Sequence, residues 1–172
     1  MNIIELTDRW VNIDGKHYIN NDEGRAKILD EYGEEDYNML ISEWGNTTQC
    51  PLEFIQNEIR EIKEKELDTA FNRAVEGSFI TTEGYKMQFN TDDSLKMFGA
   101  IQLLESSGVE TGYITDADDN THYEVPVSVM KSVQNQMLKK YAQCHLMKQK
   151  YRSMINESES IEDLTKINIT FE

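Results

Sequence analysis

The chain has 172 residues, of which 32 are acidic and 17 are basic, so its formal net charge at pH 7 is −15. A surface with this charge repels phosphate backbones and anionic membranes, which argues against nucleic-acid binding. Apolar residues make up 38% of the sequence and occur along its whole length, so we expect a folded, soluble protein. No segment approaches the roughly 20 apolar residues that span a bilayer, and the acidic N-terminus lacks the pattern of a secretory signal.

The first predicted element is a β-hairpin over residues 9–20, in which Asp14-Gly15 supplies the positive φ angles of a type I′ turn. A hairpin of two strands is marginally stable alone, so its aromatic side chains must pack on something else. Two short helices follow, the first capped by Asn21 or Asp22. Each of these helices is predicted to end at a glycine, Gly33 and Gly45 respectively.

A long helix is predicted between Pro51 and Gly77, because proline is favoured at the start of a helix and glycine just past its end. After Glu66 its apolar stripe shifts, as in a coiled-coil stutter. Two interpretations stay open, an amphipathic helix packed on its own domain and a short self-associating stem, since two heptads are too few to decide. The candidates for the oligomer interface share the three-and-four spacing of a coiled-coil seam: Leu52, Ile55, Ile59 and Ile62.

The C-terminal half is predicted to alternate hairpins with helices. Its first helix carries five apolar residues: Leu95, Phe98, Ile101, Leu103 and Leu104. The predicted elements, in chain order, are a hairpin at 79–89, a helix capped by Asp92, Asp93 or Ser94 that stops at Gly108, a hairpin turning at 116–120, a helix over 127–155 and a terminal helix from Ser160.

The sequence therefore predicts an α+β fold of short β-hairpins packed with amphipathic helices, including one long C-terminal helix. We expect three segments. Residues 1–50 form a small N-terminal α+β arm and candidate attachment module, residues 51–76 a linking helix and candidate oligomerisation stem, and residues 77–172 a C-terminal domain.

The run Asp116-x-Asp118-x-Asn120 begins like a calcium loop, in which alternate oxygen side chains converge on one cation. Thr121 stands where such a loop needs glycine, and Val127 stands where it needs the closing glutamate. We favour an ordinary solvated hairpin turn over an adventitious divalent-ion site.

The adjacent pair Cys144-His145 is unsuited to thiol catalysis, because neighbouring helix residues point about 100° apart. We expect Cys144 in the core with His145 beside it, and both Cys50 and Cys144 as reduced thiols. The spacing of His17, His122 and His145 does not suggest a zinc site.

The acidic run at residues 34–36 opens a predicted helix, where the helix dipole stabilises negative charge without any catalytic role. The sequence contains no Gly-rich phosphate loop, no GxSxG elbow and no HExxH motif. We therefore predict that the protein is not an enzyme, and we predict no catalytic residue, cofactor, metal or small-molecule substrate.

From about Ile62 to Ile167 the order of these features resembles a C-terminal domain of unknown function found in tailed-bacteriophage tail-fibre, tail-fibre-assembly and related virion proteins. Relatives often carry a tryptophan where Tyr113-Ile114 stands here. The features that carry the resemblance are Ala74-Val75-Glu76-Gly77, the hairpin Phe79 to Phe89 with Gly84, the cap Asp92-Asp93-Ser94 before Ile101, Gly112-Tyr113, the turn Thr115 to Asn120, the helix Val127 to Ile155, and the tail through Ile161, Leu164 and Ile167.

The resemblance implies a structural component of a bacteriophage virion, in the tail, the tail-fibre base or an adaptor, that acts by protein–protein assembly. Its partners would be other tail or fibre proteins and further copies of itself, and it would reach the virion after synthesis in the bacterial cytoplasm. The alternative is a non-virion chaperone of tail-fibre assembly, with an adaptable helix face rich in methionine: Met130, Met137, Met147 and Met154.

Overall fold

The computed structural model describes residues 1–171, which fold into two compact units. Unit 1 comprises Met1–Glu66 and Arg152–Asn168, and unit 2 comprises Leu67–Tyr151 with the residues from Ile169 onward. The described residues form six helices and three small antiparallel sheets, which confirms the predicted α+β class. The division into segments 1–50, 51–76 and 77–172 stays a prediction. None of the described helices is both long and apolar enough to cross a membrane.

Unit 1 contains a sheet with the strand order β1-β2-β3. The predicted hairpin is confirmed, and Asp14 and Gly15 have the φ values of 53° and 86° that a type I′ turn requires. The sequence did not predict the first strand, which is short, at most partly buried, and lies at an edge of the sheet. The strands are β1 (Ile3–Leu6), β2 (Trp10–Ile13) and β3 (Lys16–Ile19).

One face of this sheet packs on helices α1 (Asp22–Tyr32) and α2 (Glu34–Trp44). Asn21 caps α1, since its side chain accepts a hydrogen bond from the amide of Gly24. Gly24 also lets α1 approach β3, because a Cβ there would lie 2.0 Å from the Ile19 carbonyl oxygen. The core of this layer consists of Val11, Ile13, Tyr18, Ile28, Leu40 and Trp44.

Helix α3 (Leu52–Val75) contributes to both units. Its buried positions follow one another at intervals of four residues from Ile55 to Val75. Four residues turn a helix by about 400°, so the buried line rotates by about 200° over this length. In place of the expected stutter at Glu66, the buried line rotates continuously. Lys63 lies on this line, 9% exposed, and pairs with Glu66 at 2.9 Å.

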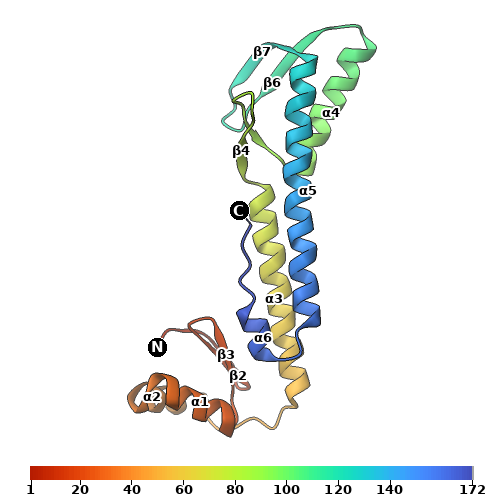
Figure 1. The fold of residues 1–172 in the computed structure, drawn as a ribbon. Helices are drawn as coiled ribbons and strands as arrows, with labels where there is room; N and C mark the ends of the chain where they lie inside the picture. The colour runs from red at the N-terminus through yellow and green to blue at the C-terminus, as the bar shows by residue number, and fades with distance from the viewer. Residues whose placement is uncertain (172) are drawn as a thin grey trace. The chain divides into compact units, whose positions relative to one another are not determined.

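Unit 2 packs two hairpins and helix α4 against helix α5 (Figure 1). The predicted elements are present, but Asn90 caps α4 in place of Asp92, Asp93 or Ser94, because its side chain accepts the amide hydrogen of Asp93. The elements are β4 (Ser78–Ile80), β5 (Lys86–Gln88), α4 (Thr91–Ser106), β6 (Thr111–Thr115), β7 (Thr121–Pro126) and α5 (Val127–Glu157).

The long helix α5 carries the predicted apolar stripe into the core of unit 2. Met130, Val133, Met137 and Cys144 are each at most 3% exposed. They pack with residues of α3, α4 and the hairpins: Phe71, Val75, Met87, Phe89, Met97, Ile101, Ile114 and Val125.

The chain returns to unit 1 through helix α6 (Ile161–Lys166), which packs against β3. Ser160 caps this helix by accepting the amide hydrogen of Asp163, as the sequence predicts. Leu164 is fully buried and Ile167 is 5% exposed, so the short helix adds an apolar contribution to the unit.

Candidate interaction surfaces

The four residues predicted as an oligomer seam lie in different environments on α3. Ile55 and Ile59 are fully buried within the chain, Ile62 is partly buried, and Leu52 is 58% exposed. This burial supports the interpretation in which α3 packs on its own chain. A seam for a second copy at these residues stays a prediction, and its accessible part is Leu52.

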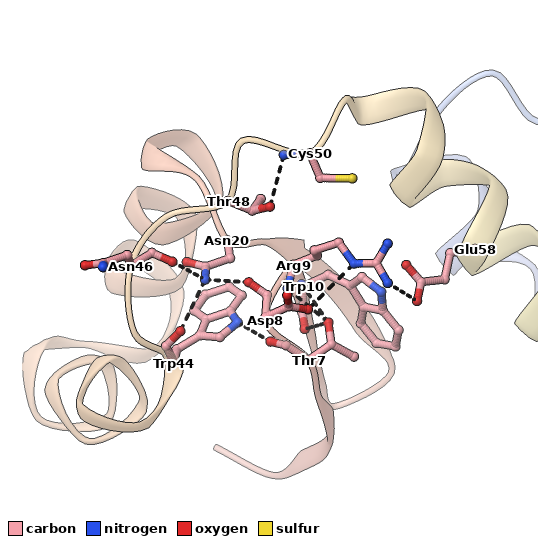
Figure 2. A network of polar contacts seen from close by, with 10 residues as sticks. All are labelled: Thr7, Asp8, Arg9, Trp10, Asn20, Trp44, Asn46, Thr48, Cys50 and Glu58. Carbon is pink, nitrogen blue, oxygen red and sulfur yellow. Dashed lines mark hydrogen bonds and ion pairs between the residues drawn. The ribbon is translucent and has the colours of Figure 1, made fainter.

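Unit 1 contains a buried polar network centred on Asn20, which is fully buried (Figure 2). Its amide nitrogen donates to the backbone carbonyls of Asp8, Trp44 and Asn46 at 2.9, 3.3 and 2.9 Å. Its carbonyl oxygen accepts from the Arg25 guanidinium at 2.9 and 2.7 Å. Because these bonds satisfy buried backbone groups of two loops, the network stabilises the unit and is not exposed to a substrate.

Two further contacts of the same network join distant parts of unit 1. The Trp44 indole donates to the Thr7 carbonyl oxygen at 2.7 Å, and the Arg9 guanidinium pairs with Glu58 of α3 at 3.1 Å. Figure 2 shows both contacts beside the Asn20 amide. The loop at residues 7–9 is therefore held by α2 on one side and by α3 on the other.

On the opposite face of the sheet, His17 lies among Trp10, Asn12 and Lys63. The ring of His17 is 4.9 Å from that of Trp10 between centroids, and its Nε2 is 3.4 Å from the Asn12 amide nitrogen. Burial, together with the positive charge of Lys63, lowers the pKa of His17 to about 4. His17 is therefore neutral at pH 7.

The polar turn between β6 and β7 is organised by Asp116. Its carboxylate accepts hydrogen bonds from the backbone amides of Asp118 and Asn120, both at 2.9 Å, and lies 3.0 Å from His122 Nε2. The contact with His122 and these amides holds the pKa of Asp116 well below its usual range. Its oxygens thus bind their own turn, as expected of an ordinary hairpin. Among residues 1–171, no group of three or more metal-ligating acids, histidines or cysteines comes together.

The other side chains considered as candidates for catalysis have structural roles. Cys144 is 3% exposed in the core, and burial raises the pKa of its thiol. His145 packs against the rings of Phe71 and Tyr141, at 6.3 Å between centroids in each case. The acidic residues 34–36 occupy the first turn of α2, where the sequence analysis placed them.

A groove with a volume of about 370 Å³ lies between α4 and the hairpins of unit 2. Buried Met87, Met97 and Ile114 line it together with Lys96 and the exposed ring of Tyr113. The carboxylates of Asp93, Asp116 and Asp119 also line it, so the groove combines apolar side chains with charged ones.

A β-bulge in β7 determines which side chains of the second hairpin face outward. Gly112 pairs with Val125 but Ile114 pairs with His122, so β7 holds one extra residue in this interval. Glu124 accommodates it with a φ of 57°. Without the bulge, strict alternation would put Tyr123 on the same face as buried Val125.

Tyr123 is 77% exposed and Tyr113 is 63% exposed, and both stand in the interval of the hairpin that contains the bulge. Isolated exposed apolar residues are ordinary, but two exposed tyrosines within one short interval of a hairpin form a surface suited to a protein partner. The sequence predicted this hairpin without the bulge, since nothing in residues 121–126 marks an extra residue.

Helix α4 provides the second apolar surface. Of the apolar residues named for this helix, Ile101 is 1% exposed and Leu104 is partly buried, but Leu95 and Leu103 are each 68% exposed. A helical wheel would have revealed two stripes on opposite sides, since residues 94, 97 and 101 cluster on one face and residues 95, 99 and 103 on the other.

Comparisons with family models, with curated proteins and with solved structures find no match to this chain.

Proposed function

We propose that the protein is a structural component of a bacteriophage virion, in the tail, the tail-fibre base or an adaptor, acting by protein–protein assembly. The phage setting comes from the sequence resemblance of residues 62–167. The observation that supports an assembly role is the exposure of Tyr113 and Tyr123 in the interval of the second hairpin that contains the bulge. The strained bulge raises the free energy of the folded chain. Contact between a partner and the two exposed aromatic rings would offset this cost.

The electrostatics of the chain also suit this role. A net charge of −15 keeps free copies apart and soluble in the cytoplasm before assembly. Apolar contacts at a few uncharged places on such a surface would then decide which partners bind.

The alternative, a chaperone of tail-fibre assembly, depended on an adaptable methionine face. Met130 and Met137 are 1% and 0% exposed and belong to the core, and Met147 is partly buried, whereas Met154 is 41% exposed. A helix that commits two of its four methionines to its own core offers less adaptable surface. This favours the virion role.

The proposal can be tested with a phage whose copy of this gene is interrupted, with the chain supplied from a plasmid. We expect the wild-type chain to restore the yield of infectious particles and the double variant Tyr113→Ser/Tyr123→Ser to restore at most about a tenth of it. Both rings are exposed, so the variant should fold. The control is Leu146→Ser, an equally exposed site on α5 at 71%. A normal yield without any chain would contradict the proposal.

A further inference from the structure

The groove of unit 2 combines an apolar floor with an acidic rim. Its floor consists of Met87, Met97 and Ile114, which are 4%, 9% and 1% exposed. Two carboxylates of the rim, those of Asp116 and Asp119, belong to the turn that follows β6. The volume of about 370 Å³ lies at the lower end of the range of ligand sites, so the groove can hold a long side chain with some of its flanking backbone.

The charges that line the groove do not cancel. Among residues 1–171, neither Asp116 nor Asp119 pairs with a lysine or an arginine. The Asp116 carboxylate bonds to amides of its own turn and to His122, whereas the exposed side chain of Asp119 has no polar partner in the described part of the chain. The third acid, Asp93, pairs with the exposed Lys96 at 3.3 Å. Three acids against one lysine make the groove attractive to a cation.

The apolar floor restricts which kind of cation fits. A hydrated metal ion would leave the floor without contact, and the described residues hold no cluster of three or more metal-ligating side chains. An arginine side chain has an aliphatic stem that can cover the floor while its guanidinium reaches the carboxylates. The ring of Tyr113, 63% exposed and also in the lining, adds a face on which a planar guanidinium stacks.

We propose that this groove binds an arginine side chain from a basic segment of a partner protein, with the stem over the apolar floor and the guanidinium at Asp119. A protein segment fits better than a free small cation, because Tyr113 belongs both to the groove and to the exposed tyrosine surface of the second hairpin. A net charge of −15 also attracts a basic partner. The proposal deepens the assembly role proposed above and rests on it.

A short peptide tests the groove directly. The probe is acetyl-Gly-Ala-Arg-Ala-Gly-amide, titrated at low salt into the full isotope-labelled chain and followed by NMR. We expect saturable shifts of the backbone amides of Ala100, Thr115 and Ala117, with a dissociation constant on the order of 1 mM. The same peptide with citrulline in place of arginine keeps the length but loses the charge, and it should bind about tenfold more weakly.

Two charge variants separate the groove from the general acidity of the chain. Asp119→Asn should raise the dissociation constant by about fivefold, because it removes a carboxylate that has no partner of its own. Asparagine tolerates the φ of 62° at this position, so the variant should keep the turn. The control, Asp92→Asn, removes the same charge from an exposed acid of α4 outside the lining and should change the constant by less than about twofold.

A steric variant tests the apolar part of the groove. Ala100 is an exposed residue of α4 in the lining, and leucine is a good helix former, so Ala100→Leu should fold. The added side chain should fill the space of the arginine stem and weaken binding by about tenfold. Gln102→Leu, at an exposed position of the same helix outside the lining, should leave binding unchanged.

Equal binding of the arginine and citrulline peptides contradicts the proposal, and so does an Asp119→Asn variant that binds as tightly as wild type. Butylguanidinium, a free cation with an aliphatic stem, should bind more weakly than the peptide. If it binds as tightly, the groove is a site for small cations and the protein segment is overturned.

Failure of the groove and failure of the virion role are distinguishable. A chain that is present in virions but does not bind the peptide overturns the arginine site alone. A chain that binds the peptide through Asp119 but is absent from virions overturns the virion role alone.

Discussion

At the scale of single residues, the buried side chain of Asn20 connects two loops of unit 1. Its amide nitrogen donates hydrogen bonds to backbone carbonyls of both loops, at residues 7–9 and 44–46. The sequence could not reveal this, because the partners are backbone carbonyls up to 26 residues away and carry no side-chain signature. The cap at Asn21, its neighbour, was predictable because its partner is three residues away.

We predict that Asn20→Ala destabilises unit 1 by about 3 kcal/mol, since it leaves buried carbonyls without a donor and removes the acceptor of two Arg25 hydrogen bonds. Both tryptophans of the chain, Trp10 and Trp44, lie in unit 1, so their fluorescence during urea unfolding reports on this unit. The control is Asn46→Ala, whose exposed side chain is not part of the network. A loss of less than about 0.5 kcal/mol for Asn20→Ala would contradict this account.

His17 gives a prediction for pH. Its pKa is about 4 in the folded protein, against an ordinary value of 6.5, so the unfolded chain binds a proton first as the pH falls. The contribution of His17 is fully present above pH 6.5 and is lost progressively toward pH 4. Between pH 7 and pH 5, the loss amounts to about 2 kcal/mol in the unfolding free energy of unit 1.

The contribution of His17 is measured by comparing wild type with His17→Gln, followed by tryptophan fluorescence at each pH. Lys63 and Glu66 face the ring, and both are retained in the variant. The variant should lose about 2 kcal/mol less than wild type over this interval. Identical pH dependence in the two proteins would show that His17 is not buried as described.

At the scale of elements, local signals predicted the helices well. Glycines, caps and apolar spacing located α1, α3, α5 and α6 near their observed bounds. Strand β1 and the bulge of β7 escaped prediction, because pairing and register depend on contacts with a second segment. The exposure of Tyr113 and Tyr123 was not predicted, for the same reason.

The bulge itself is testable at Glu124, which holds a left-handed φ of 57°. Glu124→Gly should stabilise unit 2 by about 1 kcal/mol, because glycine adopts this conformation without strain. Glu124→Val should destabilise it by at least as much, since a β-branched residue is disfavoured there. Thermal melting followed by circular dichroism measures both. Equal stability of the two variants would contradict a bulge at this position.

Two glycines in helices give matched substitutions with opposite outcomes. Gly24→Ala should destabilise unit 1 by about 2 kcal/mol or more, because the new Cβ would lie 2.0 Å from the Ile19 carbonyl oxygen. Gly99→Ala should stabilise unit 2, because nothing lies within 4 Å of its Cβ. Urea unfolding of the two variants provides the comparison. A stabilising effect of Gly24→Ala would mean that α1 does not approach β3 in this way.

At the scale of the whole molecule, composition and periodicity predicted the α+β class because they depend on averages over many residues. They could not decide whether Ile55 and Ile59 face their own chain or a second one. Those distinctions depend on which neighbours the folded chain brings together. The two seam isoleucines proved to be buried, and the exposed apolar surface lies on α4 and the second hairpin.

The virion role is the central claim, and quantitative mass spectrometry of purified phage particles tests it most directly. Isotope-labelled peptides of this chain and of a major tail protein would give the number of copies per particle. We predict a fixed ratio that survives washing in high salt and is the same in independent preparations. Absence from particles, while the chain is abundant in the infected cell, would contradict a structural role and favour the chaperone.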